Sequence, residues 1–236
     1  MNKQVLTVQA GIDLNAIMRE VSRIPPRNSL AELIDNCFDA GSLHCNIYVE
    51  GKSSPTKILL VDSGSGLNED ALKAFFVYGK SEWQSKRHKG RNGKGSKYML
   101  WHASKILVRT RCRDEANVKT FQLDLENWMK QILKGESVAI ETDSKVGAHE
   151  FDPPKGAFTL IEISPKKEVA KEFTEETLLE SMAELLSPQY ADRVFVNGKN
   201  LAAREVSSFQ DQTNVPTLGD VRVYIYQPTD VKYRDG

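Results

Sequence analysis

Three polar residues on one predicted helix have the types and the spacing of a site that binds a cation and activates water. Glu32, Asn36 and Asp39 are four and three residues apart, so they share one face of a helix over Ser29 to Ala40. No Lys or Arg stands beside them to form the pairs common on surface helices. A carboxylate and an amide in this arrangement suit a metal ion and a water molecule that is to be activated.

The opposite face of this helix is apolar and predicts burial against a core, because its residues recur at helical spacing: Leu30, Leu33, Ile34, Cys37 and Phe38. Pro25 and Pro26 end the preceding segment, and Gly41 stands where glycine commonly follows the last helical residue. One alternative stays open for the polar face. Ser29 and Glu32 have the spacing of a capping box, in which Glu32 would only start the helix.

A second candidate follows a predicted strand. The apolar, β-branched run over 57–61 leads into Asp62-Ser63-Gly64-Ser65-Gly66-Leu67. Gly64 and Gly66 lack side chains where the backbone would pass close to a ligand, and Asp62 could accept a hydrogen bond from the exocyclic amine of adenine. The alternative is a plain turn after a strand, where Asp and Gly are common.

A third candidate is the glycine-rich stretch Gly90-Arg91-Asn92-Gly93-Lys94-Gly95-Ser96-Lys97, which precedes a predicted helix over 98–103. Backbone N–H groups of such a loop and the start of a helix favour an anion such as phosphate. The whole segment 79–97 is basic, so Lys80, Lys94 and Lys97 are candidate phosphate contacts by their charge. Neither a Walker A motif nor a Rossmann fingerprint is present, and a solvated basic loop is the alternative.

The three motifs stand in the order Glu-x-x-x-Asn-x-x-Asp-Ala, Asp-x-Gly-x-Gly and Gly-x-x-Gly-x-Gly. This order resembles the nucleotide-binding domain shared by gyrase B subunits, ninety-kilodalton heat-shock chaperones, histidine kinases and MutL proteins. The resemblance to this GHKL family, or Bergerat fold, covers roughly residues 10–165. It is nearest to the chaperone, MutL and MORC branch, because Asp-Ala follows the Asn and no phosphoacceptor histidine helix precedes the domain.

The resemblance implies binding and hydrolysis of ATP with Mg²⁺, and it gives the matching residues roles. Glu32 would be the general base for the attacking water, Asn36 the Mg²⁺ ligand, and Asp39 a helix position near the nucleotide. Asp62 would bind the adenine amino group. The other nucleotide contacts that it implies are Gly64, Gly66, Gly90, Gly93, Gly95 and Thr159, to which charge adds Lys80, Lys94 and Lys97.

The remaining elements predict an α+β fold, a two-layer sandwich with helices on one face of a mixed sheet. We expect helices over 12–23 and 174–186, and strands paired two by two over 44–50 and 57–62, 104–112 and 118–125, and 137–142 and 157–163. Residues 1–190 are expected to form the ATP-binding domain. Residues 191–236 are expected to begin a second, β-rich, transducer-like domain of a longer protein, whose C-terminal domains are missing here.

Composition narrows the classes of function. Lys and Arg together number 32, as do Asp and Glu, so overall charge gives no argument for a nucleic-acid partner. Three Cys without metal or disulfide spacing, no secretory signal and no long apolar run predict a soluble, cytoplasmic protein without a membrane partner. The functions left open are an ATPase that dimerises when its lid closes and acts on a client protein or DNA, a non-hydrolysing nucleotide sensor, and a nucleic-acid module using the basic segment 79–97.

Overall fold

The computed structural model describes residues 4–8, 23–76, 95–133, 138–142, 155–201, 207–215 and 219–227. The chain divides into two compact units, residues 1–201 and 202–236. The expected helix over 12–23 and most of the basic segment 79–97 lie outside the described residues.

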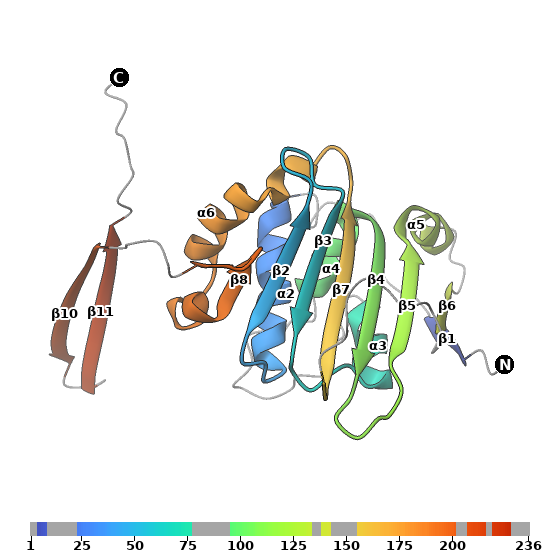
Figure 1. Ribbon diagram of the computed structural model, residues 1–236, viewed down its shortest axis with the longest axis horizontal. Coiled ribbons are helices and arrows are strands. Elements are labelled where there is room, and N and C mark those ends of the chain that lie inside the picture. The colour runs from blue at the N-terminus through green and yellow to red at the C-terminus, as the bar shows by residue number, and fades with distance from the viewer. Residues whose placement is uncertain are drawn as a thin grey trace. The chain divides into compact units, whose positions relative to one another are not determined.

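A nine-stranded sheet of described residues forms one layer of the first unit, and α2, α3 and α4 lie on one of its faces (Figure 1). The strand order is β1-β6-β5-β4-β7-β3-β2-β8-β9. All neighbours are antiparallel except β2 and β8, so the sheet is mixed, as predicted. The strands are β1 (Gln4–Val8), β2 (Cys45–Glu50), β3 (Lys57–Asp62), β4 (Ala103–Arg111), β5 (Lys119–Asp124), β6 (Val138–Thr142), β7 (Phe158–Pro165), β8 (Val194–Val196) and β9 (Lys199–Asn200).

Helices and short 3₁₀ turns make up the second layer and the links between strands. They are α2 (Pro26–Asp39), α3 (Glu69–Phe76), α4 (Gly95–His102), α5 (Leu125–Leu133), η1 (Ala170–Phe173), α6 (Glu175–Leu185) and η2 (Pro188–Arg193). The sequence did not predict α3, α5 or β1. No helix in the part of the chain that the structure describes combines the length and the apolar character needed to cross a membrane.

Helix α2 buries the predicted apolar stripe, since Leu30, Leu33 and Ile34 are at most 1% exposed. The helix begins at Pro26, three residues before Ser29, and no side chain caps it. Proline suits this first position because its φ is already helical and its missing N–H is not needed there. The capping-box alternative is therefore wrong, and Glu32 lies inside the helix.

Successive side chains of β3 point to opposite faces of the sheet. Ile58 and Leu60 point to the helices and belong to the main core, whereas Leu59 and Val61 belong to a smaller cluster on the other face. Asp62 continues the helix-facing series. The last residue of this strand therefore points into the space between the two layers.

One expectation about pairing differs from the structure. Strands β6 and β7 do not pair with each other, because β7 lies between β3 and β4 while β6 pairs with β5 and β1. Since β7 is buried on both faces over most of its length, it suits a central position. Strands β8 and β9, which fall in the range expected for the second domain, extend the sheet of the first unit beside β2. The second unit contains the hairpin β10 (Ser207–Val215) and β11 (Gly219–Gln227).

Candidate functional site

A row of four side chains crosses the sheet on its helix-facing side. The register places Cys45 opposite Asp62, Asp62 opposite Thr159, and Thr159 opposite Thr110. All four residues are buried, with Asp62 and Thr159 only 4% and 5% exposed. Burying polar groups in this way is costly unless partners or a ligand satisfy them. The fold thus joins two predicted site residues, Asp62 and Thr159, that lie far apart in the sequence.

The environment of Asp62 makes its ionised form less favourable than it is in water. Burial raises the pKa of this carboxyl to about 6, although the backbone N–H of Gly64 and the side chain of Cys37 act in the opposite direction. The Gly64 N–H donates to Asp62 Oδ1 over 2.7 Å. Cys37 lies on α2 and remains a neutral thiol, because contact with Cys45 and burial raise its pKa well above the usual value. A buried acid with so perturbed a pKa is a good candidate for a functional group.

The C-terminal turn of α2 fixes the loop that follows Asp62. Gly41 has a φ of 81°, and the N–H groups of Gly41 and Ser42 donate to the carbonyls of Phe38 and Cys37 in the Schellman pattern. The Ala40 carbonyl then accepts from the Ser65 N–H over 2.9 Å. Helix α2 therefore anchors the Asp62 loop as well as carrying the predicted catalytic face.

The two glycines of this loop lie against the protein's own backbone. A Cβ on Gly64 would lie 2.9 Å from the Ala40 carbonyl, and a Cβ on Gly66 would lie 2.3 Å from the Arg111 carbonyl. Gly66 also has a φ of 75°, which favours glycine. Both glycines are thus needed to bring the loop close to α2 and β4. Their contact with a nucleotide stays a prediction.

We expect Gly66→Ala to destabilise the fold by about 2–4 kcal/mol, because the new methyl group meets backbone that cannot move aside. Gly156→Ala is the matched control: its φ is 92° but nothing lies within 4 Å of its Cβ, so it should cost only about 1–2 kcal/mol. Urea unfolding of both variants measures the difference. Equal losses would mean that the close approach to Arg111 does not matter.

The polar face of α2 is accessible, as a reactive face requires. Glu32 is exposed, while Asn36 and Asp39 are half-buried. Asp39 Oδ2 is buried and accepts no hydrogen bond from the described residues, so a ligand could satisfy it. Helix α2 packs against α4, which begins at Gly95 and carries Lys97 in its first turn. Lys80, Gly90, Gly93 and Lys94 lie outside the described residues.

Two residues of the site were not predicted. Thr110 Oγ1 accepts from the Leu67 N–H over 2.7 Å and donates to the Phe158 carbonyl over 2.9 Å. Ser42 Oγ accepts from the Ser63 N–H over 2.9 Å. The signal for Thr110 was a hydroxyl residue that continues the alternate apolar positions Ile106 and Val108 along β4.

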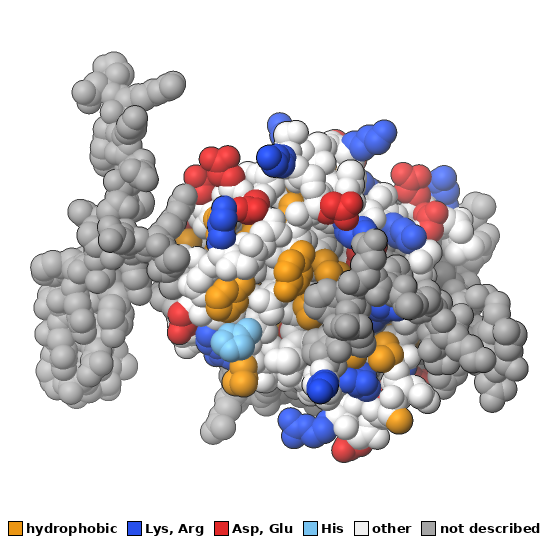
Figure 2. Space-filling model, viewed as in Figure 1, with side chains coloured by type: hydrophobic (Ala, Val, Ile, Leu, Met, Phe, Trp, Pro, Cys, Tyr) orange, Lys and Arg blue, Asp and Glu red, His pale blue; other side chains and the backbone are white. Residues whose placement is uncertain are grey.

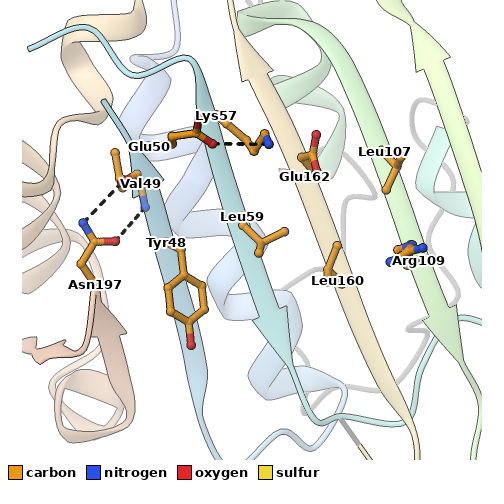
Figure 3. A pocket seen from close by; sticks show the side chains of 10 residues that line it. All are labelled: Tyr48, Val49, Glu50, Lys57, Leu59, Leu107, Arg109, Leu160, Glu162 and Asn197. Atoms are coloured by element: carbon orange, nitrogen blue, oxygen red, sulfur yellow. Dashed lines mark hydrogen bonds and ion pairs between the residues drawn. The ribbon is translucent and has the colours of Figure 1, made fainter. Parts of the chain in front are cut away.

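A pocket of about 400 Å³ lies on the other face of the sheet (Figure 3). Leu59, Leu107 and Leu160 line it together with Tyr48, and Lys57 pairs with Glu50 at 3.4 Å beside it. Hydrophobic side chains on this face are surrounded by charged ones (Figure 2). Because strand alternation puts this pocket and the Asp62 row on opposite faces, one small ligand cannot occupy both.

A family model described as histidine kinase-, DNA gyrase B-, and HSP90-like ATPase matches residues 24–149, more than half of the chain. The chain therefore belongs to this family of ATPases. The match confirms the family read from the three motifs, and with the mixed sheet and its helix layer it confirms the predicted fold class. It makes ATP the expected ligand of the domain. No curated protein matches the chain.

The residues present fit the nucleotide that the family implies. Asp62 offers a buried acceptor, and Asp39 Oδ2 is a buried oxygen that no described residue satisfies. The described residues contain no group of three or more His, Cys, Asp or Glu arranged to hold a metal ion.

Proposed function

We propose that this chain binds ATP with Mg²⁺ and hydrolyses it, and that closure of segment 79–97 over the phosphates promotes dimerisation. The observation that carries the proposal is the buried pair of Asp62 and Thr159 in register on the helix-facing side of the sheet. The pair lies next to α2, the helix that bears Glu32 and Asn36. The side chain of Cys37, on the same helix, interacts with Asp62. Family membership adds the expectation of ATP.

The adenine end of the site is assigned to Asp62. A carboxylate oxygen there would accept a hydrogen bond from the exocyclic amine of adenine, and the Thr159 hydroxyl opposite it can donate or accept. Because both groups are buried, a base that failed to match them would leave a polar group unsatisfied. This arrangement would select adenine over guanine.

The phosphate end is assigned to the polar face of α2. Glu32 would take a proton from the attacking water, and Asn36 Oδ1 would bind Mg²⁺. When bound, Mg²⁺ neutralises phosphate charge and orients the phosphates. It commonly keeps several waters and takes phosphate oxygens as further ligands, so one protein oxygen from Asn36 is enough.

We further propose that the chain belongs to the chaperone, MutL and MORC branch, because α2 and the Ala40 that follows it carry the Asp-Asn-Cys-Phe-Asp-Ala run. The hairpin of the second unit would then belong to a transducer-like domain. A cytoplasmic location and a client protein or DNA as the object of the ATP cycle fit this branch. A non-hydrolysing sensor is the main alternative, and Glu32 argues against it since binding alone needs no base.

Phosphate release from ATP, measured with and without Mg²⁺, tests the proposal. Light scattering with a non-hydrolysable ATP analogue tests dimerisation on the same preparation. We expect Mg²⁺-dependent turnover and a larger mass with the analogue than with ADP. Binding without turnover would instead support the sensor, and an unchanged mass would remove dimerisation from the proposal.

We expect Asn36→Ala to weaken binding of ATP in the presence of Mg²⁺ by about 10-fold or more, because a metal ligand is lost. Affinity for ADP without Mg²⁺ should stay within about twofold, since adenine contacts are unchanged. Asn28→Ala, in the first turn of the same helix, is the control. Calorimetric titration measures both affinities. An equal loss of nucleotide affinity with and without Mg²⁺ would contradict the assignment of Asn36 as the Mg²⁺ ligand.

A further inference from the structure

The guanidinium of Arg193 clamps the turn between α2 and β2. Arg193 Nε donates to the Leu43 carbonyl over 2.7 Å, and Nη2 donates to the Ser42 carbonyl. The same group stacks over the Phe38 ring, with 4.6 Å between Cζ and the ring centroid. Tyr190 stacks on Phe38 in turn, at 4.1 Å between centroids. One side chain from η2 thus holds both the end of α2 and the following turn.

The clamped turn is the one that fixes the loop after Asp62. Ser42 is 1% exposed, and its hydroxyl accepts from the Ser63 N–H and donates to the His44 carbonyl. Two residues earlier, the Ala40 carbonyl accepts from the Ser65 N–H. Arg193 is therefore linked to the loop after Asp62 through Ser42: it donates to the Ser42 carbonyl, and the Ser42 hydroxyl accepts from the Ser63 N–H.

Arg193 also lies directly before the strand that pairs with β2, the strand that follows the clamped turn. It is the last residue of η2, and the next residue begins β8, which pairs in parallel with β2 from Cys45 to Ile47. A second contact, from Lys199 to Glu175 at 2.6 Å, holds the β9 end of this segment to α6 and does not touch the turn. The two contacts can therefore be removed separately.

We propose that Arg193 is a positioning residue for the adenine end of the site and couples nucleotide binding to the η2–β8 segment. This inference rests on the proposed function. A bound adenine that needs Asp62 and Ser63 to Ser65 in place favours the clamped state, and by linkage the clamp strengthens adenine binding by the same factor. The guanidinium suits this task because its fork donates to two carbonyls while its plane stacks on a ring.

Calorimetric titration of ADP and GDP into the parent chain, Arg193→Ala, Arg193→Lys and Lys199→Ala tests the proposal. We expect Arg193→Ala to weaken ADP binding by about 5- to 10-fold, the loss of roughly one hydrogen bond's net contribution, and to reduce the preference for ADP over GDP. Lys199→Ala should bind ADP within about twofold of the parent, because the turn is untouched. The affinity of Arg193→Lys for ADP should lie between those of Arg193→Ala and Lys199→Ala. If Arg193→Ala does not fold, Arg193→Lys takes its place in the comparison.

Arg193 variants that unfold at a lower temperature, yet bind ADP with the parent's affinity and preference, would overturn the proposal and leave a structural role. If the parent binds neither nucleotide, the proposed function fails. The contribution of Arg193 to the position of the loop is then measured by amide hydrogen exchange. Faster exchange at Ser63 and Ser65 in Arg193→Ala than in Lys199→Ala would support the clamp. Equal exchange in the two variants would overturn it.

Discussion

Replacing Glu32 with Ala should reduce the rate of ATP hydrolysis by about 10²- to 10⁴-fold, the contribution typical of a positioned general base. Affinity for ATP should stay close to that of the parent, because Glu32 is assigned to the water and not to the nucleotide. The fold should tolerate the change, since Glu32 is exposed inside α2 and Ala is the best helix former.

Single-turnover phosphate release, with ATP bound to saturation, measures the chemical step in this variant. Glu184→Ala is the matched control, an exposed glutamate on α6 in the same chain. A Glu32→Ala variant that hydrolyses ATP at the parent's rate would remove the base assignment. Equal losses in both variants would point to a general effect of charge.

Asp62→Asn should abolish nucleotide binding, with an affinity loss of about 100-fold or more, since a buried donor would face another donor. Asp62 Oδ1 already accepts from the Gly64 N–H, so the amide oxygen of Asn would take that place. The amide NH₂ would then point toward the adenine amine. A carboxylate accepts at both oxygens and avoids this conflict.

The same substitution should stabilise the unliganded protein at pH 7.5. The folded pKa of about 6 lies above the reference value of 3.8, so the folded state binds more protons than the unfolded chain between about pH 4 and 6. The contribution of Asp62 to stability therefore falls as the pH rises through this window. Above about pH 6 the ionised carboxyl opposes folding by about 3 kcal/mol, and Asn removes this cost.

Thermal unfolding of the parent and Asp62→Asn from pH 4 to pH 8 measures this effect, and ADP titration of the same samples measures binding. We expect the Asn variant to gain stability relative to the parent as the pH rises to about 6. Asp192→Asn, at an exposed position, is the control. An Asp62→Asn variant that binds ADP as the parent does would show that adenine is bound elsewhere.

Local patterns predicted the elements that carry the site, and non-local pairing decided how they meet. The apolar stripe of α2 and the strand ending at Asp62 could be read from the sequence because both periodicities are short. The register that aligns Asp62 and Thr110 on either side of Thr159 joins strands distant in the chain, and no local signal encodes it. Thr159 was reached only through the family resemblance. Arg193 was assigned to the second domain because the parallel pairing of β8 with β2 leaves no mark in the sequence.

Calorimetric titration of ATP and ADP into the parent chain, each with and without Mg²⁺, is the most direct test of the proposed site. We predict saturable binding of both nucleotides, with ATP binding strengthened by Mg²⁺. Failure of both to bind under either condition would contradict a nucleotide site built on Asp62 and α2.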